Sequence, residues 1–183
     1  GIQCHIGSQI TTLAPYRRAA VAVAKSVARL AEDGIHLDFA DLGGGIGITY
    51  EAETPFSPKA LARIIEEAFA PWPAMRLLLE PGRFFVADAG VLLTRVLYRK
   101  KTTKRDFVIV DAAMTDLPRP ALYGAWHPVE AVKPRPGPKT TMDVVGPVCE
   151  SGDFLARARR LPPLERGDLL AVGKAGAYGF SMS

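Results

Sequence analysis

The chain has 183 residues, of which 48% are hydrophobic and 23% are charged, as in an ordinary globular protein. No apolar run approaches the roughly 18 residues that a membrane span needs. The net charge of +4 is modest and the basic residues are scattered, which is weak support for nucleic-acid binding. We therefore expect neither a membrane nor a nucleic acid among its partners.

Cysteine usage and the first residues bear on the compartment. Cys4 and Cys149 are too few for a disulfide framework, which favours a reducing cytoplasm. The first residues show neither the basic start nor the apolar segment of a signal peptide. Because the sequence begins at Gly1, without an initiator Met and inside an apparent strand, we expect a fragment of a longer protein.

The first half of the chain alternates strand and helix patterns. Strands end at glycines or polar residues, and each helix has an apolar face, with Ser57 and Pro58 forming a typical helix start. This alternation predicts parallel strands covered by helices. The predicted elements are a strand at Gly1–Ile6, a helix at Pro15–Asp33, a strand at Ile35–Leu42, a helix that starts at Ser57-Pro58 and is ended by Pro71-Trp72-Pro73, and a strand at Leu77–Leu79.

The second half has an all-β pattern without a long helix. The proline-rich stretch Pro118–Pro138 is predicted to be loop, interrupted at Val129–Val132. The strands predicted there are Gly90–Arg99, Asp106–Val110, Met142–Val148 and Asp168–Val172. The change of pattern falls near Ala87–Gly90, so we expect one domain over residues 1–88 and a second over residues 89–183.

Several short motifs follow predicted strands, where parallel α/β proteins bind ligands. Glu80 and Arg83, in Glu-Pro-Gly-Arg, could form a structural ion pair or hold the two ends of a charged ligand. The Gly43-Gly44-Gly45 loop suits either a tight turn or close backbone approach to a phosphate, for which Ser8 is a second donor. These residues alone do not decide between the alternatives.

The sequence also leaves the roles of other polar residues undecided. His5 could be a satisfied core residue, and Cys149 could be an inert thiol or a proton donor beside Glu150. Arg119 and Tyr123 could be a solvated loop arginine and a half-buried tyrosine, or could grip a carboxylate, while Tyr178, next to Gly179, could pack in the core or lie against a planar ligand. The three His and two Cys residues lack the spacing of a metal site, so no metal is expected.

Taken in order along the chain, these motifs resemble the diaminopimelate decarboxylases. That family belongs to the fold-type III, alanine-racemase-like decarboxylases that use pyridoxal 5′-phosphate. The resemblance is carried by His5-Ile6-Gly7-Ser8-Gln9, Gly43-Gly44-Gly45, Glu80-Pro81-Gly82-Arg83, Asp111–Tyr123, Cys149-Glu150-Ser151-Gly152-Asp153 and Ala177-Tyr178-Gly179. It implies the carboxyl-terminal part of a (β/α)8 barrel followed by a β-barrel or β-sandwich domain.

The resemblance also implies roles for the cofactor residues. His5 would stack on the pyridine ring, and Glu80 would keep the ring nitrogen protonated so that the ring withdraws electrons. The glycine loop and the turn at Glu80–Arg83 would bind the cofactor, chiefly through its phosphate. Tyr178 would touch both cofactor and substrate. The residues implied for this group are Ser8, Gly43, Gly44, Gly45, Glu80, Pro81, Gly82 and Arg83.

The substrate residues follow in the same way. Arg83, Arg119 and Tyr123 would bind the distal carboxylate of meso-2,6-diaminopimelate, and Glu150 its distal ammonium. Cys149 would protonate the α-carbon after CO2 leaves, giving L-lysine. Cys149 and Glu150 would reach the site of a neighbouring subunit, which implies a homodimer.

Two alternatives to this reading remain at this stage. A sibling decarboxylase for ornithine or arginine would need no arginine pair, because its substrate has no second carboxylate. A non-catalytic homologue would bind a partner instead. The Schiff-base lysine of the family lies upstream of anything in this sequence, so we expect a carboxy-lyase whose isolated 183-residue portion has little or no activity.

Overall fold

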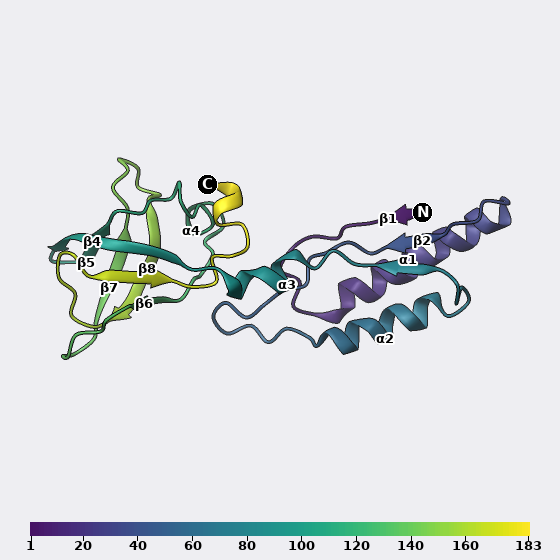
Figure 1. Cartoon of the computed structure of the whole chain (residues 1–183), viewed down its shortest axis with the longest axis horizontal. Coiled ribbons are helices and arrows are strands. Elements are labelled where there is room, and N and C mark those ends of the chain that lie inside the picture. The colour runs from purple at the N-terminus through teal and green to yellow at the C-terminus, as the bar shows by residue number, and fades with distance from the viewer. The chain divides into compact units, whose positions relative to one another are not determined.

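The computed structural model describes residues 1–183, which divide into two compact units. The first unit, Gly1–Phe85, contains a small parallel sheet and two long helices, and the second, Val86–Ser183, is built mainly from strands (Figure 1). The predicted change from an α/β to an all-β pattern is confirmed. The structure changes unit between residues 85 and 86, and the predicted domain limit between residues 88 and 89 stays a prediction.

Three parallel strands form the sheet of the first unit. β1 (Ile2–Gln3) pairs with β2 (Phe39–Asp41), which also pairs with β3 (Arg76–Leu78). The helices α1 (Leu13–Glu32) and α2 (Pro58–Phe69) connect the strands and run side by side along the sheet (Figure 1). All three strands therefore end at the same edge of the sheet.

The helices form where sequence and packing agree. Ser57 caps α2, its Oγ accepting the Ala60 N–H at 3.3 Å, and Pro58 follows at the first helical position. Leu61, Ile64 and Ile65 lie on one face and are buried. They meet the buried face of α1 and Ala40 of β2 in one core, each buried aliphatic side chain contributing about 1.5–3 kcal/mol.

The second unit is organised around one six-stranded sheet with the order β6-β9-β4-β5-β7-β8. Neighbours are antiparallel except β5 and β7, which run parallel. The edge strands β6 and β8 also approach each other, so the sheet nearly closes into a barrel. Its strands are β4 (Leu92–Lys101), β5 (Asp106–Val110), β6 (Val129–Ala131), β7 (Thr140–Val145), β8 (Phe154–Leu161) and β9 (Leu169–Val172).

Valine and leucine side chains from all of these strands fill the interior of the second unit. The members with 0% exposure include Val96, Val108, Val144, Leu155 and Leu170. Leu117, from the connection between β5 and β6, closes the same core. The core thus fixes the start of the short helix α4 (Arg119–Tyr123), which begins two residues later.

Several elements differ from those predicted. The strand predicted at Gly1–Ile6 is only Ile2–Gln3, because pairing to β2 stops at Gln3. β8 was missed, since Ala158 adopts a left-handed φ of 52° and its N–H turns to the Asp143 carboxylate at 2.7 Å, which breaks the alternation. The stretch Pro118–Pro138 is not all loop, because α4 lies within it. Three further short helices are α3 (Gly82–Val86), η1 (Ala87–Ala89) and η2 (Phe180–Met182).

Candidate functional site

The carboxyl edge of the three-stranded sheet collects the predicted cofactor residues. His5 follows β1, the glycine loop follows β2 and Glu80 follows β3. The Gly44 N–H donates to His5 Nδ1 at 3.3 Å, and the Glu80 N–H donates to the Gly43 carbonyl at 2.9 Å. In this bond His5 Nδ1 is the acceptor. The three strand ends are thus joined into one constellation.

Close backbone packing explains all three loop glycines, and a Cβ on Gly43, where φ is +68°, would overlap the Cys4 carbonyl oxygen. A Cβ on Gly44 would overlap the Glu80 carbonyl oxygen, and one on Gly45, where φ is +96°, would overlap the Gly7 carbonyl oxygen. Any side chain there would push the strand ends apart. The loop therefore requires glycine for sheet packing, and its contact with a phosphate stays a prediction.

Tyr16 of α1 supports this loop from beneath. Its side chain is buried, and its hydroxyl donates to the Gly44 carbonyl at 2.9 Å. Burial raises the pKa of Tyr16 to about 12, so the phenol stays protonated and remains a donor. Sequence analysis did not single out Tyr16, because an aromatic residue on the apolar face of a helix usually serves only the core.

Arg83 lies at the same edge and is held by two hydroxyl groups. Its Nη1 donates to Tyr50 Oη at 2.5 Å, and its Nη2 donates to Ser8 Oγ at 3.0 Å. Although Arg83 is only 8% exposed, Ser8 and the preceding Glu80 are exposed. The contact with Ser8 was not foreseen, and Tyr50 was missed, because it is separated by 33 residues from the arginine that it binds.

The charges at this edge match a ligand with two different ends. Glu80 supplies an exposed carboxylate that can hold a cationic ring nitrogen, and Arg83 supplies a fixed cation for an anion. His5 adds an exposed ring that can stack on a planar group. Pro81 and Gly82 form the turn between the two charged residues, and α3 begins at Gly82.

In the second unit, Arg119 begins α4 and is only 6% exposed. Its Nη1 lies 2.7 Å from Nε2 of His127, which has no exposed surface. The solvent-facing alternative for Arg119 is therefore wrong. Tyr123, four residues later, is 67% exposed, and Gly124 ends the helix with a φ of +61°. His127 was missed because a single histidine before a proline carries no recognisable motif.

Cys149 and Glu150 lie in the exposed loop between β7 and β8. Cys149 is a free, exposed thiol rather than a buried one. Glu150 folds back on its own loop, where the Gly152 N–H and the Ser151 hydroxyl bind its carboxylate at 3.1 and 3.0 Å and lower its pKa. The loop therefore presents a thiol and an ionised carboxylate to solvent.

A buried carboxylate anchors that loop. Asp153 is 4% exposed and accepts the Val148 N–H at 2.7 Å and the Met114 N–H at 2.6 Å. Met114 belongs to the connection that leads to α4. One side chain thus joins the loop carrying Cys149 to the segment before Arg119, a link that the sequence did not reveal.

Tyr178 lies near the end of the chain in an unusual backbone conformation. Its φ is +58°, which costs a non-glycine residue about 1–2 kcal/mol, and its side chain is 44% exposed. A Cβ on the neighbouring Gly179 would lie 3.5 Å from Leu117 Cδ1, so this segment packs close to the start of α4. The predicted contacts of Tyr178 with ligands stay predictions.

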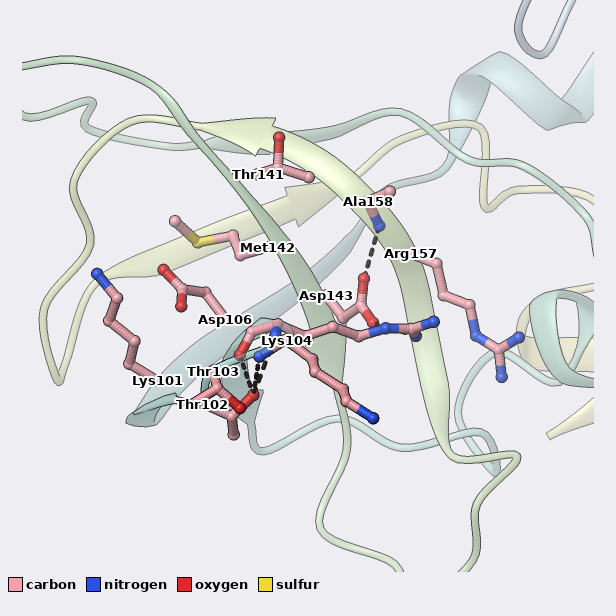
Figure 2. A pocket seen from close by; sticks show the side chains of 11 residues that line it. Lys101, Thr102, Thr103, Lys104, Asp106, Thr141, Met142, Asp143, Arg157 and Ala158 are labelled. Carbon is pink, nitrogen blue, oxygen red and sulfur yellow. Dashed lines mark hydrogen bonds and ion pairs between the residues drawn. The ribbon is translucent and has the colours of Figure 1, made fainter.

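A cavity of about 510 Å³ lies elsewhere in the second unit, beside the β4–β5 turn (Figure 2). In Figure 2, Asp143 lies in its wall and accepts the Ala158 N–H. Arg105 pairs with the same carboxylate at 3.1 Å. None of the predicted site residues lines this cavity. The structure has no cluster of three side chains suited to a metal ion, and none of its helices combines the length and apolarity that crossing a membrane requires.

Comparison with known families gives one match over most of the chain. The family described as pyridoxal-dependent decarboxylase, C-terminal sheet domain, matches residues 21–176. Among curated relatives, diaminopimelate decarboxylase of Pseudomonas aeruginosa is 53% identical over the whole chain, which spans 44% of that protein. The corresponding enzyme of Vibrio cholerae is 47% identical, with the same two coverages. The chain thus spans less than half the length of these relatives.

Comparison with solved structures also finds diaminopimelate decarboxylases. Diaminopimelate decarboxylase from Helicobacter pylori, complexed with L-lysine, has a TM-score of 0.93 and 45% identity, with 99% of this chain and 45% of that one covered. A structure described as SrLDC in complex with PLP and cadaverine has a TM-score of 0.87 and 26% identity, with 100% of this chain and 48% of that one covered.

Proposed function

This chain belongs to the family of pyridoxal-dependent decarboxylases, and we propose that it forms the carboxyl-terminal part of a diaminopimelate decarboxylase. The complete enzyme would convert meso-2,6-diaminopimelate into L-lysine and CO2 in the cytoplasm, as the last step of lysine biosynthesis. Residues 1–88 would be the final part of its (β/α)8 barrel, and residues 89–183 its β-domain.

The observation that carries this proposal is the identity of 53% over an alignment that covers the whole chain. The residues at the carboxyl edge of the three-stranded sheet can be compared with the chemical groups of the cofactor. Pyridoxal 5′-phosphate has a planar ring, a ring nitrogen that favours an anion, and a phosphate that favours cations and N–H groups. Glu80, Arg83 and His5 provide these three kinds of contact at one edge, so the residues fit the group.

We assign the cofactor contacts accordingly. His5 would lie against the ring, Glu80 would bind the ring nitrogen, and Ser8 and the loop at Gly43, Gly44 and Gly45 would bind the phosphate with the turn at Pro81, Gly82 and Arg83. Pyridoxal phosphate, when bound, supplies a ring that accepts the electron pair left on the α-carbon as CO2 departs. The role of Glu80 is to keep the ring nitrogen protonated, and Tyr178 would touch both cofactor and substrate.

The second unit would supply the substrate contacts. Arg119 and Tyr123, with Arg83, would bind the distal carboxylate, and Glu150 would bind the distal ammonium. Cys149 Sγ would deliver a proton to the α-carbon after decarboxylation. We propose that Cys149 and Glu150 act in the site of the partner subunit of a homodimer, which is consistent with their position on an exposed loop.

Arg119 distinguishes diaminopimelate from the substrates of the sibling enzymes. A buried guanidinium such as Arg119 binds a carboxylate in a bidentate manner, and ornithine and arginine carry no second carboxylate to offer it. SrLDC, crystallised with cadaverine, is only 26% identical, against about 50% for the named diaminopimelate decarboxylases. The sibling alternative is therefore not favoured. A non-catalytic binding protein would not need the cofactor residues retained here.

The test is turnover by the full-length protein that contains this chain, loaded with pyridoxal phosphate. We expect L-lysine and CO2 in equal amounts from meso-diaminopimelate, and little turnover of ornithine, arginine or lysine. Arg119→Met should raise KM for diaminopimelate by at least about tenfold, because a charge-assisted bond is lost. Arg135→Met is a matched control, since Arg135 is an exposed guanidinium that binds Asp168. Preferred turnover of ornithine or arginine would contradict the proposal.

A further inference from the structure

His127 makes two hydrogen bonds that run in opposite directions from its ring. Nε2 lies 2.7 Å from Nη1 of Arg119, and Nδ1 lies 2.9 Å from the carbonyl oxygen of Gly173. His127 has no exposed surface, and Arg119 is 6% exposed. This buried contact therefore involves a residue that the proposed function places at the substrate's distal carboxylate.

The chemistry of the two partners fixes the state of the ring. An arginine guanidinium only donates hydrogen bonds, so Nε2 must accept. A backbone carbonyl only accepts, so Nδ1 must carry the proton. His127 is thus a neutral imidazole in one tautomer, with one nitrogen committed to each partner.

The carbonyl partner lies at the end of a hydrogen-bonded strand pair in the second unit. Gly173 follows β9 directly, and its own N–H donates to the Pro128 carbonyl at 2.9 Å, which continues the pairing of β6 with β9. A Cβ on Gly173 would come within 2.9 Å of Pro128 Cγ, so the two backbones are in close contact. His127 therefore extends from the end of a strand pair to the first residue of α4.

We propose that His127 is a positioning residue that orients the Arg119 guanidinium for the distal carboxylate of the substrate. This inference rests on the function proposed above. The guanidinium is a planar fork, and binding a carboxylate in a bidentate manner requires the correct rotation of that plane. Holding Nη1 on Nε2 removes that freedom before substrate binds, which lowers the entropy lost on binding.

The two amide substitutions of His127 separate its two bonds. In His127→Gln the side-chain oxygen can occupy the place of Nε2 and accept from Arg119. In His127→Asn the shorter amide can occupy the place of Nδ1 and donate to Gly173, but it does not reach Arg119. Both variants are polar and smaller than histidine, so a role limited to filling the core would affect them similarly.

The measurement is steady-state kinetics of the full-length, cofactor-loaded enzyme, with thermal unfolding to establish that each variant folds. We expect His127→Asn to raise KM for diaminopimelate about tenfold or more with kcat within about twofold, and His127→Gln to stay within about threefold of the unsubstituted KM. Equal changes in KM for the two variants would overturn the proposal, as would a loss confined to kcat.

Binding of product supplies a second readout. L-lysine retains the distal carboxylate of diaminopimelate, whereas cadaverine has both amines and no carboxylate. Calorimetry should show that His127→Asn weakens L-lysine binding about tenfold and leaves cadaverine binding unchanged. Equal weakening of both ligands would overturn the inference. An unsubstituted enzyme that fails to decarboxylate diaminopimelate would instead contradict the proposed function.

Discussion

At the scale of single residues, Tyr16 links the core of the first unit to the carboxyl edge of its sheet. The ring packs edge-on against Phe56, with centroids 5.5 Å apart, while the hydroxyl donates to Gly44. Because the phenol of Tyr16 stays protonated up to a pKa of about 12, this bond persists across the working pH range. The glycine loop therefore keeps a fixed carbonyl orientation.

Replacing Tyr16 with Phe tests this role. The substitution keeps the ring and leaves the Gly44 carbonyl without this donor, so the free energy of unfolding should fall by about 1–2 kcal/mol. Affinity for pyridoxal phosphate should fall severalfold, as measured by titration of the full-length protein. Tyr98→Phe is the control, since Tyr98 is 59% exposed on β4. An unchanged cofactor affinity would show that the loop does not depend on this bond.

The residues that sequence analysis found and missed differ in a simple way. His5, Glu80 and the glycine loop could be foreseen to converge, because parallel strands present their carboxyl ends at one edge. Tyr16 and His127 could not, because each looks like an ordinary core residue until its partner, 28 or 46 residues away, is known. Residue roles in substrate and cofactor binding stay predictions until they are measured.

At the scale of elements, the loop between β7 and β8 depends on Asp153. Its two oxygens accept one N–H from Val148, within the loop, and one from Met114, before α4. Gly146 lies against the same carboxylate, where a Cβ would collide with it. The loop that carries Cys149 is therefore set by an anion and not by regular secondary structure.

Asp153→Asn should loosen this loop. An amide can accept only one of the two N–H groups and turns its own NH2 toward the other, so the unfolding free energy should fall by roughly 2–4 kcal/mol. In the full-length enzyme kcat should fall more than KM rises, because Cys149, the proposed proton donor, would be displaced. Asp116→Asn is the control, since Asp116 accepts one N–H from Ala113. Equal losses in the two variants would contradict this assignment.

The elements themselves were predictable where one local rule decided them. α2 and β5 lie where the capping residue Ser57 and the apolar run at Asp106–Val110 place them. β8 was not predicted because its backbone is irregular at Ala158. α4 was not predicted because prolines flank Arg119, although a proline such as Pro120 is tolerated in the first turn of a helix. Tertiary contacts decided both cases.

At the scale of the whole molecule, the proposed homodimer makes each active site a shared one. Glu80 would serve the site of its own subunit, and Cys149 the site of the partner. Glu80→Ala and Cys149→Ala should each abolish most activity alone. Coexpressed in equal amounts, they should recover roughly a quarter of the unsubstituted activity, because half of the dimers contain one intact site.

The control for this mixing is coexpression of two variants that damage the same side of the site, Glu80→Ala and His5→Ala. Neither subunit then supplies an intact set of proposed cofactor residues at the edge of the three-stranded sheet, and no activity should return. Failure of the first pair to recover activity, with both proteins dimeric by sedimentation, would place Cys149 in its own subunit's site and contradict the shared arrangement.

The parallel pairing of β5 with β7 has a consequence for how the second unit folds. The chain between them, residues 111–139, must close as one large loop before the two strands can pair, and such non-local pairing slows folding. Arg119 and His127 lie inside this loop, and the carbonyl of Gly173 that orients His127 arrives later still, after β9. A nascent chain emerging from the ribosome therefore holds both side chains before it holds the backbone group that aligns them.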